Sequence, residues 1–326
     1  MPFQQFIKQA NLLGNEHKPF FFLIDFEQQK PIIHALDQLD NNQLCFNILG
    51  QKNYHEDWNK ANKTKLKLMP YPMPFSSYLE SFNLVQDALQ KGNSYLLNLT
   101  FPTKIETNYD LKQIFEQSKA PFKLYLKEQF VCFSPEPFIQ IKNNNISTFP
   151  MKGTINAKLE NAAQQLLNNQ KEEREHYTIV DLMRNDLALV ATNIKVKRFR
   201  YIEEINTEKG QILQTSSEIE GQLPTNWQSN IGNILAKLLP AGSISGAPKE
   251  KTVEIIKNAE QKERGYYTGV FGLFDGNQLY SAVAIRFIEQ INHQYFFRSG
   301  GGITIESKAR DEYQELIDKI YIPLKK

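Results

Sequence analysis

Long blocks with strand patterns alternate with long blocks with helical patterns along this chain of 326 residues. The strand-rich blocks are residues 94–103, 122–148 and 267–305. The helix-rich blocks are residues 76–92, 157–191, 230–239, 249–260 and 308–320. A doubly wound parallel sheet requires regular strand–helix–strand alternation, which this pattern lacks. The sequence therefore favours the α+β class.

The first 75 residues have a pattern of their own. Short apolar runs at 20–26 and 44–49 predict strands between polar turns. Residues 54–74 are polar and hold three prolines near their end, which is typical of a surface connection. We therefore predict a short N-terminal part, residues 1–75, packed on the same fold as a main region, residues 76–326, in one structural domain.

Charge and apolar segments argue against several classes of protein. The 38 Lys and Arg residues nearly balance 36 Asp and Glu residues, so a net charge of +2 gives no reason to expect nucleic acid or a membrane surface as a partner. The densest basic run, 195–200, reads as a solvated strand face. The apolar run 20–24 is too short to span a bilayer, and the N-terminus lacks the apolar segment of a signal peptide. Cys45 and Cys132 form no metal-binding or redox motif, so we expect a cytoplasmic protein.

Two predicted helices each present a pair of glutamates. Glu172 and Glu175 are three residues apart, as are Glu312 and Glu315, and Lys319 follows on the face of the second pair. Carboxylates from two helices can hold Mg²⁺, which keeps several waters and accepts the remaining ligands from substrate oxygen. Ordinary charged surfaces are the alternative interpretation of the same spacing.

Glycines and a lysine mark further positions in the strand-rich parts. Lys152 lies beside a glycine at the end of a predicted strand, where it is either a solvated residue or a buried amine that can act as a nucleophile. The glycine clusters at 242–249 and 300–302 fit no nucleotide-binding fingerprint. Their backbone N–H groups can bind an anion, or the glycines can simply form a bulge or a tight bend. Glu136 on its own indicates nothing.

Taken together and in order, a series of segments resembles the chorismate-utilising enzyme family. The segments are 95–100 (YLLNLT), 134–136 (SPE), 150–154 (PMKGT), 175–187 (EHYTIVDLMRNDL), 242–249 (GSISGAPK), 264–269 (RGYYTG), 285–286 (IR), 300–303 (GGGI) and 312–315 (EYQE). The resemblance spans about residues 76–322, so it implies that the main region binds chorismate and is catalytic. It also implies an α+β layered sandwich in which large antiparallel sheets are flanked by helices, as in anthranilate synthase component I, with the active site between the sheets.

The resemblance further implies a role for each matching residue. Mg²⁺ is expected as the cofactor, with direct ligands Glu175 and Glu315 and outer-shell residues Glu172 and Glu312. The expected substrate-binding groups are Thr154, Arg286, Lys319 and the backbone N–H groups of Gly300, Gly301 and Gly302. Glu136 is expected to be the general acid that helps the C4 hydroxyl of chorismate to leave, because hydroxide is a poor leaving group.

Lys152 distinguishes between members of the family. Aminodeoxychorismate synthases typically carry lysine at this position and anthranilate synthases carry alanine, so the chain resembles the aminodeoxychorismate synthases. That resemblance implies that the Lys152 amine attacks C2 of chorismate before ammonia adds at C4. Isochorismate and salicylate synthases place a water-activating lysine where this chain has Leu96, so we do not expect water to be the nucleophile. The product would lead to 4-aminobenzoate and folate.

The resemblance also bears on the source of ammonia and on regulation. In the family that the chain resembles, ammonia normally comes from a separate glutamine amidotransferase. We therefore expect such a partner, and no fused glutaminase. Two positions depart from the family pattern: Leu96 stands where many relatives have glutamine, and Phe287 where threonine is common. No tryptophan-binding motif is found, so a regulatory tryptophan is not expected. Anthranilate synthase component I and a non-catalytic relative that only binds chorismate or a partner are the alternatives.

Overall fold

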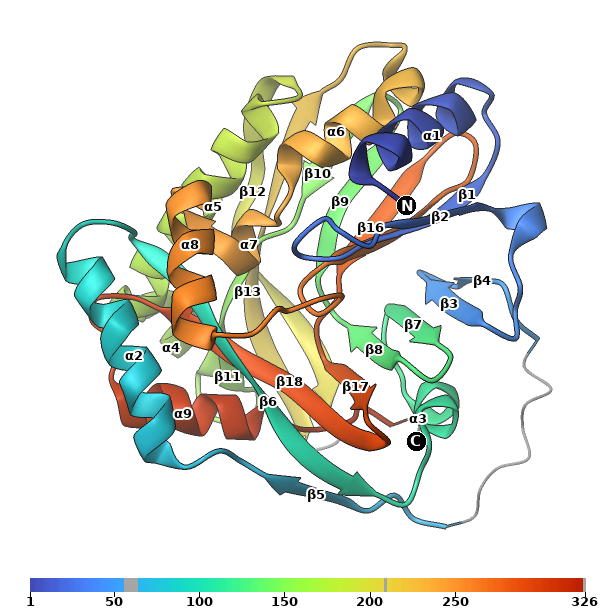
Figure 1. Ribbon diagram of the computed structural model, residues 1–326. Helices are drawn as coiled ribbons and strands as arrows, with labels where there is room; N and C mark the ends of the chain where they lie inside the picture. The colour runs from blue at the N-terminus through green and yellow to red at the C-terminus, as the bar shows by residue number, and fades with distance from the viewer. Residues whose placement is uncertain (56–63, 208–209, 325–326) are drawn as a thin grey trace.

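The computed structural model describes residues 1–55, 64–207 and 210–324 (Figure 1). Within these residues the strands form two nine-stranded sheets in which neighbouring strands pair antiparallel. The first sheet contains, in spatial order, β11 (Met151–Asn156), β13 (Gly210–Gln222), β10 (Asn145–Thr148), β9 (Pro137–Lys142), β16 (Leu279–Val283), β15 (Val270–Phe274), β1 (Phe20–Ile24) and β2 (Ile32–Ala35), and β12 (Thr192–Thr207) pairs with β13. The second contains β14 (Gly246–Ala247), β6 (Leu96–Thr107), β18 (Gln294–Ile303), β17 (Phe287–Ile291), β8 (Phe130–Ser134), β7 (Phe122–Leu126), β3 (Leu44–Ile48) and β4 (Gln51–Lys52), and β5 (Leu68–Tyr71) pairs with β6.

Helices cover the outer faces of the two sheets (Figure 1). In the described residues they are α1 (Phe3–Asn15), α2 (Phe75–Gln90), α3 (Leu111–Gln117), α4 (Ala162–Asn168), α5 (Gln170–Ala188), α6 (Ile231–Leu238), α7 (Gly242–Ser245), α8 (Lys249–Glu260) and α9 (Ala309–Asp318), with 3-10 turns at Leu36–Gln38 and Trp227–Asn230. One core cluster joins α1, α5 and α6 to the first sheet. Another joins α2, α8 and α9 to β6 and β18. The layered α+β sandwich expected from the sequence is therefore confirmed.

Strand β1 shows how the apolar sequence determines the layers. All five of its residues are buried, because the strand is covered on both faces. Phe20 and Phe22 point into the cluster beneath the helices, whereas Phe21 and Leu23 point into the cluster between the sheets. Successive side chains of a strand point to opposite faces, so a continuous apolar run is required here.

Several predicted elements differ from the structure in their boundaries. The predicted helix 157–191 begins later, at Ala162, and is divided at Asn169 into α4 and α5. The Asn169 side chain accepts hydrogen bonds from the first N–H groups of α5, which is the usual function of an N-cap asparagine. Helix α1 was not predicted. The polar connection 54–74 includes β5, and its residues 56–63 lie outside the described part of the chain.

Strands from the N-terminal part belong to both sheets. β1 pairs with β15 in the first sheet, and β3 pairs with β7 in the second. The turn 275–277 joins β15 to β16. Among the described residues, no helix is long and apolar enough to cross a membrane.

Candidate active site

One cavity of about 270 Å³ brings together residues from most of the segments that the sequence singled out. The predicted site residues on its wall are Glu136, Lys152, Thr154, Arg286, Gly300, Gly302, Glu315 and Lys319. Further wall residues come from β6, β13, α7 and the segment before β15. The volume is close to the lower end of the range for small-molecule sites. The cavity is therefore where the predicted chemistry would take place.

The two glutamate pairs approach the cavity from α5 and α9. Glu175 lies beside Lys152, with 3.6 Å between its Oε2 and the lysine Nζ. Gly301 of β18 makes room for the other pair, because a Cβ at this position would lie 3.2 Å from Oε1 of Glu315 and 3.4 Å from Oε2 of Glu312. A side chain on this residue of β18 would therefore press on the α9 carboxylates.

The carboxylates of the two helices influence one another electrostatically. Burial, followed by repulsion from Glu175, raises the pKa of Glu172, and Glu315 adds to that repulsion. Burial also raises the pKa of Glu312, and the negative charges of Glu315 and Glu175 act in the same direction. These effects reach from α5 to α9, so the two glutamate pairs lie close enough to influence one another.

Glu315 behaves differently from its neighbours because a cation touches it. Burial alone would raise its pKa, but the Lys319 ammonium lies 2.5 Å from Oε1 and the net effect is a lowered pKa. Glu175 has two lysines beside it: Nζ of Lys171 lies 3.8 Å from its Oε1, and Nζ of Lys152 lies 3.6 Å from its Oε2. The carboxylates that were predicted to bind a metal therefore interact with lysines here.

The donor set can be compared with the needs of the predicted cation. Burial, followed by repulsion between carboxylates, raises the pKa of Glu172 and Glu312. Oxygen donors in such surroundings suit a hard divalent cation such as Mg²⁺, whose charge would favour their ionised form. Within residues 1–55, 64–207 and 210–324, no group of three or more His, Cys, Asp or Glu side chains is placed to hold a metal ion. Two carboxylates with waters and a substrate oxygen would still suffice for Mg²⁺. The residues thus fit the predicted cofactor, and its binding stays a prediction.

Lys152 projects from an irregular part of β11. The register between β11 and β13 shifts between Met151 and Thr154, and Gly153 has φ +83°. A Cβ on Gly302 would lie 3.2 Å from the Lys152 amine and 3.1 Å from Cδ1 of Leu96. About a quarter of the side chain is exposed, at 23%. The Lys152 side chain is therefore partly buried, and it lies on the cavity wall.

Glu136 is held by a residue that the sequence did not single out as functional. The Ser243 hydroxyl donates a hydrogen bond of 2.6 Å to Oε1 of Glu136. Burial raises the pKa of Glu136, and the opposing effects of Ser243, Lys152 and nearby cations do not cancel the rise. A carboxyl group with a raised pKa keeps its proton to higher pH, which is what a general acid requires.

The two predicted anion-binding cations, Arg286 and Lys319, both lie on the cavity wall. Arg286 has φ +52°, in the left-handed region that residues other than glycine seldom adopt, and its Nε donates to the Tyr321 hydroxyl at 3.4 Å. Outliers of this kind cluster at functional sites. Burial, together with the charges of Arg286 and Lys152, lowers the pKa of Lys319 despite its contact with Glu315.

The glycines of β18 leave one side of that strand open. The recorded pairing of β17 with β18 ends at Arg298, whereas β6 pairs as far as Ile303. The Gly300 carbonyl accepts a hydrogen bond of 2.8 Å from Nζ of Lys319. Gly300 and Gly302 of β18 therefore lie on the cavity wall, and anion binding by the backbone of residues 300–302 stays a prediction.

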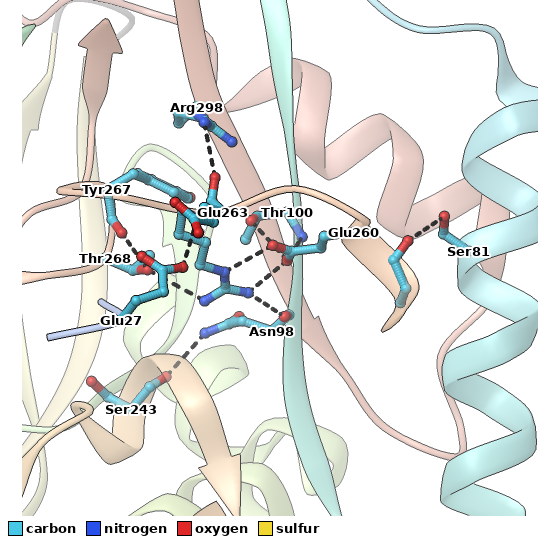
Figure 2. A network of polar contacts seen from close by, with 12 residues as sticks. Glu27, Ser81, Asn98, Thr100, Ser243, Glu260, Glu263, Tyr267, Thr268 and Arg298 are labelled. Atoms are coloured by element: carbon cyan, nitrogen blue, oxygen red, sulfur yellow. Dashed lines mark hydrogen bonds and ion pairs between the residues drawn. The ribbon is translucent and has the colours of Figure 1, made fainter. Parts of the chain in front are cut away.

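A buried polar network lies behind the cavity, and sequence reasoning did not predict it. Figure 2 shows Asn98 between Ser243 and Glu260. The Asn98 side-chain amide donates to the backbone carbonyl of Ser243 at 3.1 Å. The backbone carbonyl of Asn98 accepts a hydrogen bond from the Arg264 guanidinium at 2.8 Å. Arg264 also donates two hydrogen bonds to Glu260, of 2.6 and 2.9 Å. The available signal was that Asn98, Ser243 and Arg264 lie in the family segments YLLNLT, GSISGAPK and RGYYTG.

Comparisons with known proteins agree with the fold and identify the family. A family model described as chorismate binding enzyme matches residues 25–325. The chain is 61% identical over 321 residues to an uncharacterized PabA-like protein of Haemophilus influenzae, covering 98% of this chain and 97% of that protein. It is 35% identical over 264 residues to aminodeoxychorismate synthase component 1 of Escherichia coli, covering 76% of this chain and 57% of that protein.

A solved structure is similar over nearly the whole chain. MenF, the menaquinone-specific isochorismate synthase of Escherichia coli, superposes with a TM-score of 0.73 and 16% identity, covering 97% of this chain and 80% of that one. At this identity the likeness shows the fold alone. The family match, the paired antiparallel sheets and a cavity lined by both acids and cations define a chorismate-utilising type of enzyme. The chain belongs to the chorismate binding enzyme family.

Proposed function

We propose that the chain is component I of an aminodeoxychorismate synthase, which converts chorismate and ammonia to 4-amino-4-deoxychorismate. The observation that carries the proposal is the position of Lys152, which lies on the wall of the same cavity as Glu136 and Glu315, with its amine 3.6 Å from Oε2 of Glu175. The similarity to the Escherichia coli synthase component supports it. The Leu96 side chain and this amine both lie near Gly302. Leucine cannot activate water, which argues against an isochorismate synthase.

The proposed reaction uses two displacements. Lys152 attacks C2 as a neutral amine, the two ring double bonds shift, and the C4 hydroxyl leaves as water with the proton of Glu136. Ammonia then adds at C4, the double bonds return, and the C2–N bond breaks to release the neutral lysine. The new ammonium group returns one proton to Glu136. A nucleophile that splits one difficult substitution into two steps is the usual logic of covalent catalysis.

The remaining residues bind and orient the substrate. Chorismate carries two carboxylates, and Arg286, Lys319, Thr154 and the backbone of residues 300–302 are proposed to bind them. Glu175 and Glu315 would hold Mg²⁺, with Glu172 and Glu312 around them, and the bound ion would withdraw charge from the ring. A separate glutamine amidotransferase is proposed as the source of ammonia, in line with the component name of the Escherichia coli relative.

A coupled assay tests this function. The protein is mixed with chorismate, MgCl₂ and an ammonium salt, and a separately prepared aminodeoxychorismate lyase is added. We expect 4-aminobenzoate to form, and to form only with the lyase present. Fluorescent anthranilate without the lyase would identify an anthranilate synthase instead. Binding of chorismate without any product would identify a non-catalytic relative.

A further inference from the structure

Three successive residues in the middle of β13 bury their hydroxyl groups completely. Thr215, Ser216 and Ser217 each have 0% of their surface exposed. A buried hydroxyl destabilises the folded chain unless it is hydrogen-bonded, so each of the three needs a partner. The partners differ, and only one of them belongs to the predicted catalytic residues.

Thr215 donates its hydrogen bond to the backbone carbonyl of Lys152. This contact occurs where the β11–β13 register shifts between Met151 and Thr154. Gly153, which follows the lysine, has φ +83°, so the chain leaves the regular strand conformation there. The Thr215 side chain therefore holds the Lys152 peptide at the irregularity in the ladder.

The irregularity determines where the Lys152 amine points. A bulge turns a side chain away from the direction it would take in a regular strand. Here the amine points to Glu175, 3.6 Å from its Oε2, and to the glycine backbone of β18. Holding the Lys152 carbonyl fixes the plane of the peptide after it, and with it the start of the side chain.

The other two hydroxyls have other partners, although the His176 ring that Ser217 contacts also interacts with the Lys152 backbone. Ser216 donates to a carboxylate oxygen of Glu203 on β12, and Ser217 contacts the ring of His176 on α5 at 2.6 Å. Ser216 thus offers a matched comparison with Thr215. It is the next residue of the same strand and equally buried, but its hydrogen bond does not reach Lys152.

We propose that Thr215 is a positioning residue for the reaction, which acts through the Lys152 carbonyl to aim the lysine amine at the substrate ring. This inference rests on the proposed function of Lys152. It does not require Thr215 to touch the substrate.

The test compares Thr215→Val, Thr215→Ser and Ser216→Ala in the coupled 4-aminobenzoate assay. Valine keeps nearly the shape of threonine and removes only the hydroxyl. We expect Thr215→Val to lower kcat by up to about 100-fold, the cost of misplacing a reacting group by about 1 Å, while the KM for chorismate changes little. Thr215→Ser should recover most of kcat, because the hydroxyl is restored. Ser216→Ala should keep kcat close to that of the unmodified protein.

Several results would overturn the proposal. They are unchanged kcat in Thr215→Val, an equal loss in Ser216→Ala, or no recovery in Thr215→Ser. Lys152→Met distinguishes failure of the Thr215 inference from failure of the proposed function. Full activity in Lys152→Met would remove the lysine from the mechanism altogether. A crystal structure of Thr215→Val gives a readout that does not depend on turnover. The Lys152 amine should have moved away from Glu175, and an unmoved amine would contradict the inference.

Discussion

At the scale of single residues, the main prediction concerns Lys152. Methionine keeps the length of the side chain but has no nucleophilic nitrogen, so Lys152→Met should abolish formation of 4-amino-4-deoxychorismate. The fold should persist, because the lysine packs at a partly exposed position. The measurement is the coupled assay together with a thermal unfolding curve. Wild-type turnover in this variant would show that ammonia reaches C4 without a covalent step.

Glu136 leads to a prediction about pH. Burial raises its pKa above the usual value of 4.5, and the protonated form is the active one for a general acid. Activity should therefore fall as pH rises through this raised pKa. Ser243→Ala removes a hydrogen bond that favours the ionised form, so the pKa should rise further and the alkaline limb of the kcat profile should move to higher pH. A shift of that limb to lower pH would contradict this role for Ser243.

Glu136→Gln tests the same acid directly. The amide keeps the shape of the side chain but has no acidic proton, so kcat should fall by about 10²- to 10⁴-fold. The KM for chorismate should change much less, because Arg286 and Lys319 remain in place. Steady-state kinetics measure both quantities. Equal losses in kcat and in binding would indicate that Glu136 contacts the substrate without transferring a proton.

At the scale of elements, α5 and α9 supply the paired carboxylates. Glu172→Gln and Glu312→Gln should each raise the Mg²⁺ concentration needed for half-maximal activity by about 10- to 100-fold, the usual effect of losing a residue around a metal's ligands. Glu175→Gln and Glu315→Gln should have larger effects. Glu306→Gln is the control, because this exposed carboxylate pairs with Arg174 nearby. Unchanged Mg²⁺ titration in both Glu175→Gln and Glu315→Gln would show that the ligands are misassigned.

Local sequence predicted the elements better than it predicted the contacts between them. The helix pattern at 249–260 matches α8, but helix α1 was missed although Phe6, Ile7, Ala10 and Leu13 form its buried face. The break at Asn169 depends on a side chain capping a helix, which periodicity does not reveal. These misses arise because propensity and pattern are weak signals beside tertiary packing.

The supporting residues of the site were harder to find than the catalytic ones. The family segments indicated Lys152 and Glu136. Ser243 lies in one of these segments and Thr215 in none of them, and they hydrogen-bond to Glu136 and Lys152 from 107 and 63 residues away in sequence. A single hydroxyl residue carries no local mark of such a partner. The sequence could therefore predict the reacting groups by resemblance, and the structure was needed to show what holds them.

At the scale of the whole molecule, one buried ion pair ties parts of both sheets together. Arg264 and Glu260 have side-chain exposures of 1% and 4% and lie 2.6 Å apart. The Arg264 side chain reaches Asn98 of β6 in the second sheet. Its backbone N–H donates to the carboxylate of Glu27, just after β1 of the first sheet. Loss of the pair should therefore weaken the whole fold as well as the cavity wall.

Glu260→Gln tests that role, because it leaves the Arg264 cation buried without its charged partner. Breaking a buried pair in this way typically costs about 3–5 kcal/mol, so the urea midpoint of unfolding should fall markedly. Glu254→Gln is the control, since the exposed Lys251–Glu254 pair contributes about 0–1 kcal/mol at most. Both variants should unfold in urea as monitored by tryptophan fluorescence, because Trp227 is buried in the core of the first sheet. Equal midpoints in the two variants would mean that surrounding hydrogen bonds, such as those to Asn98 and Thr268, satisfy the guanidinium without Glu260.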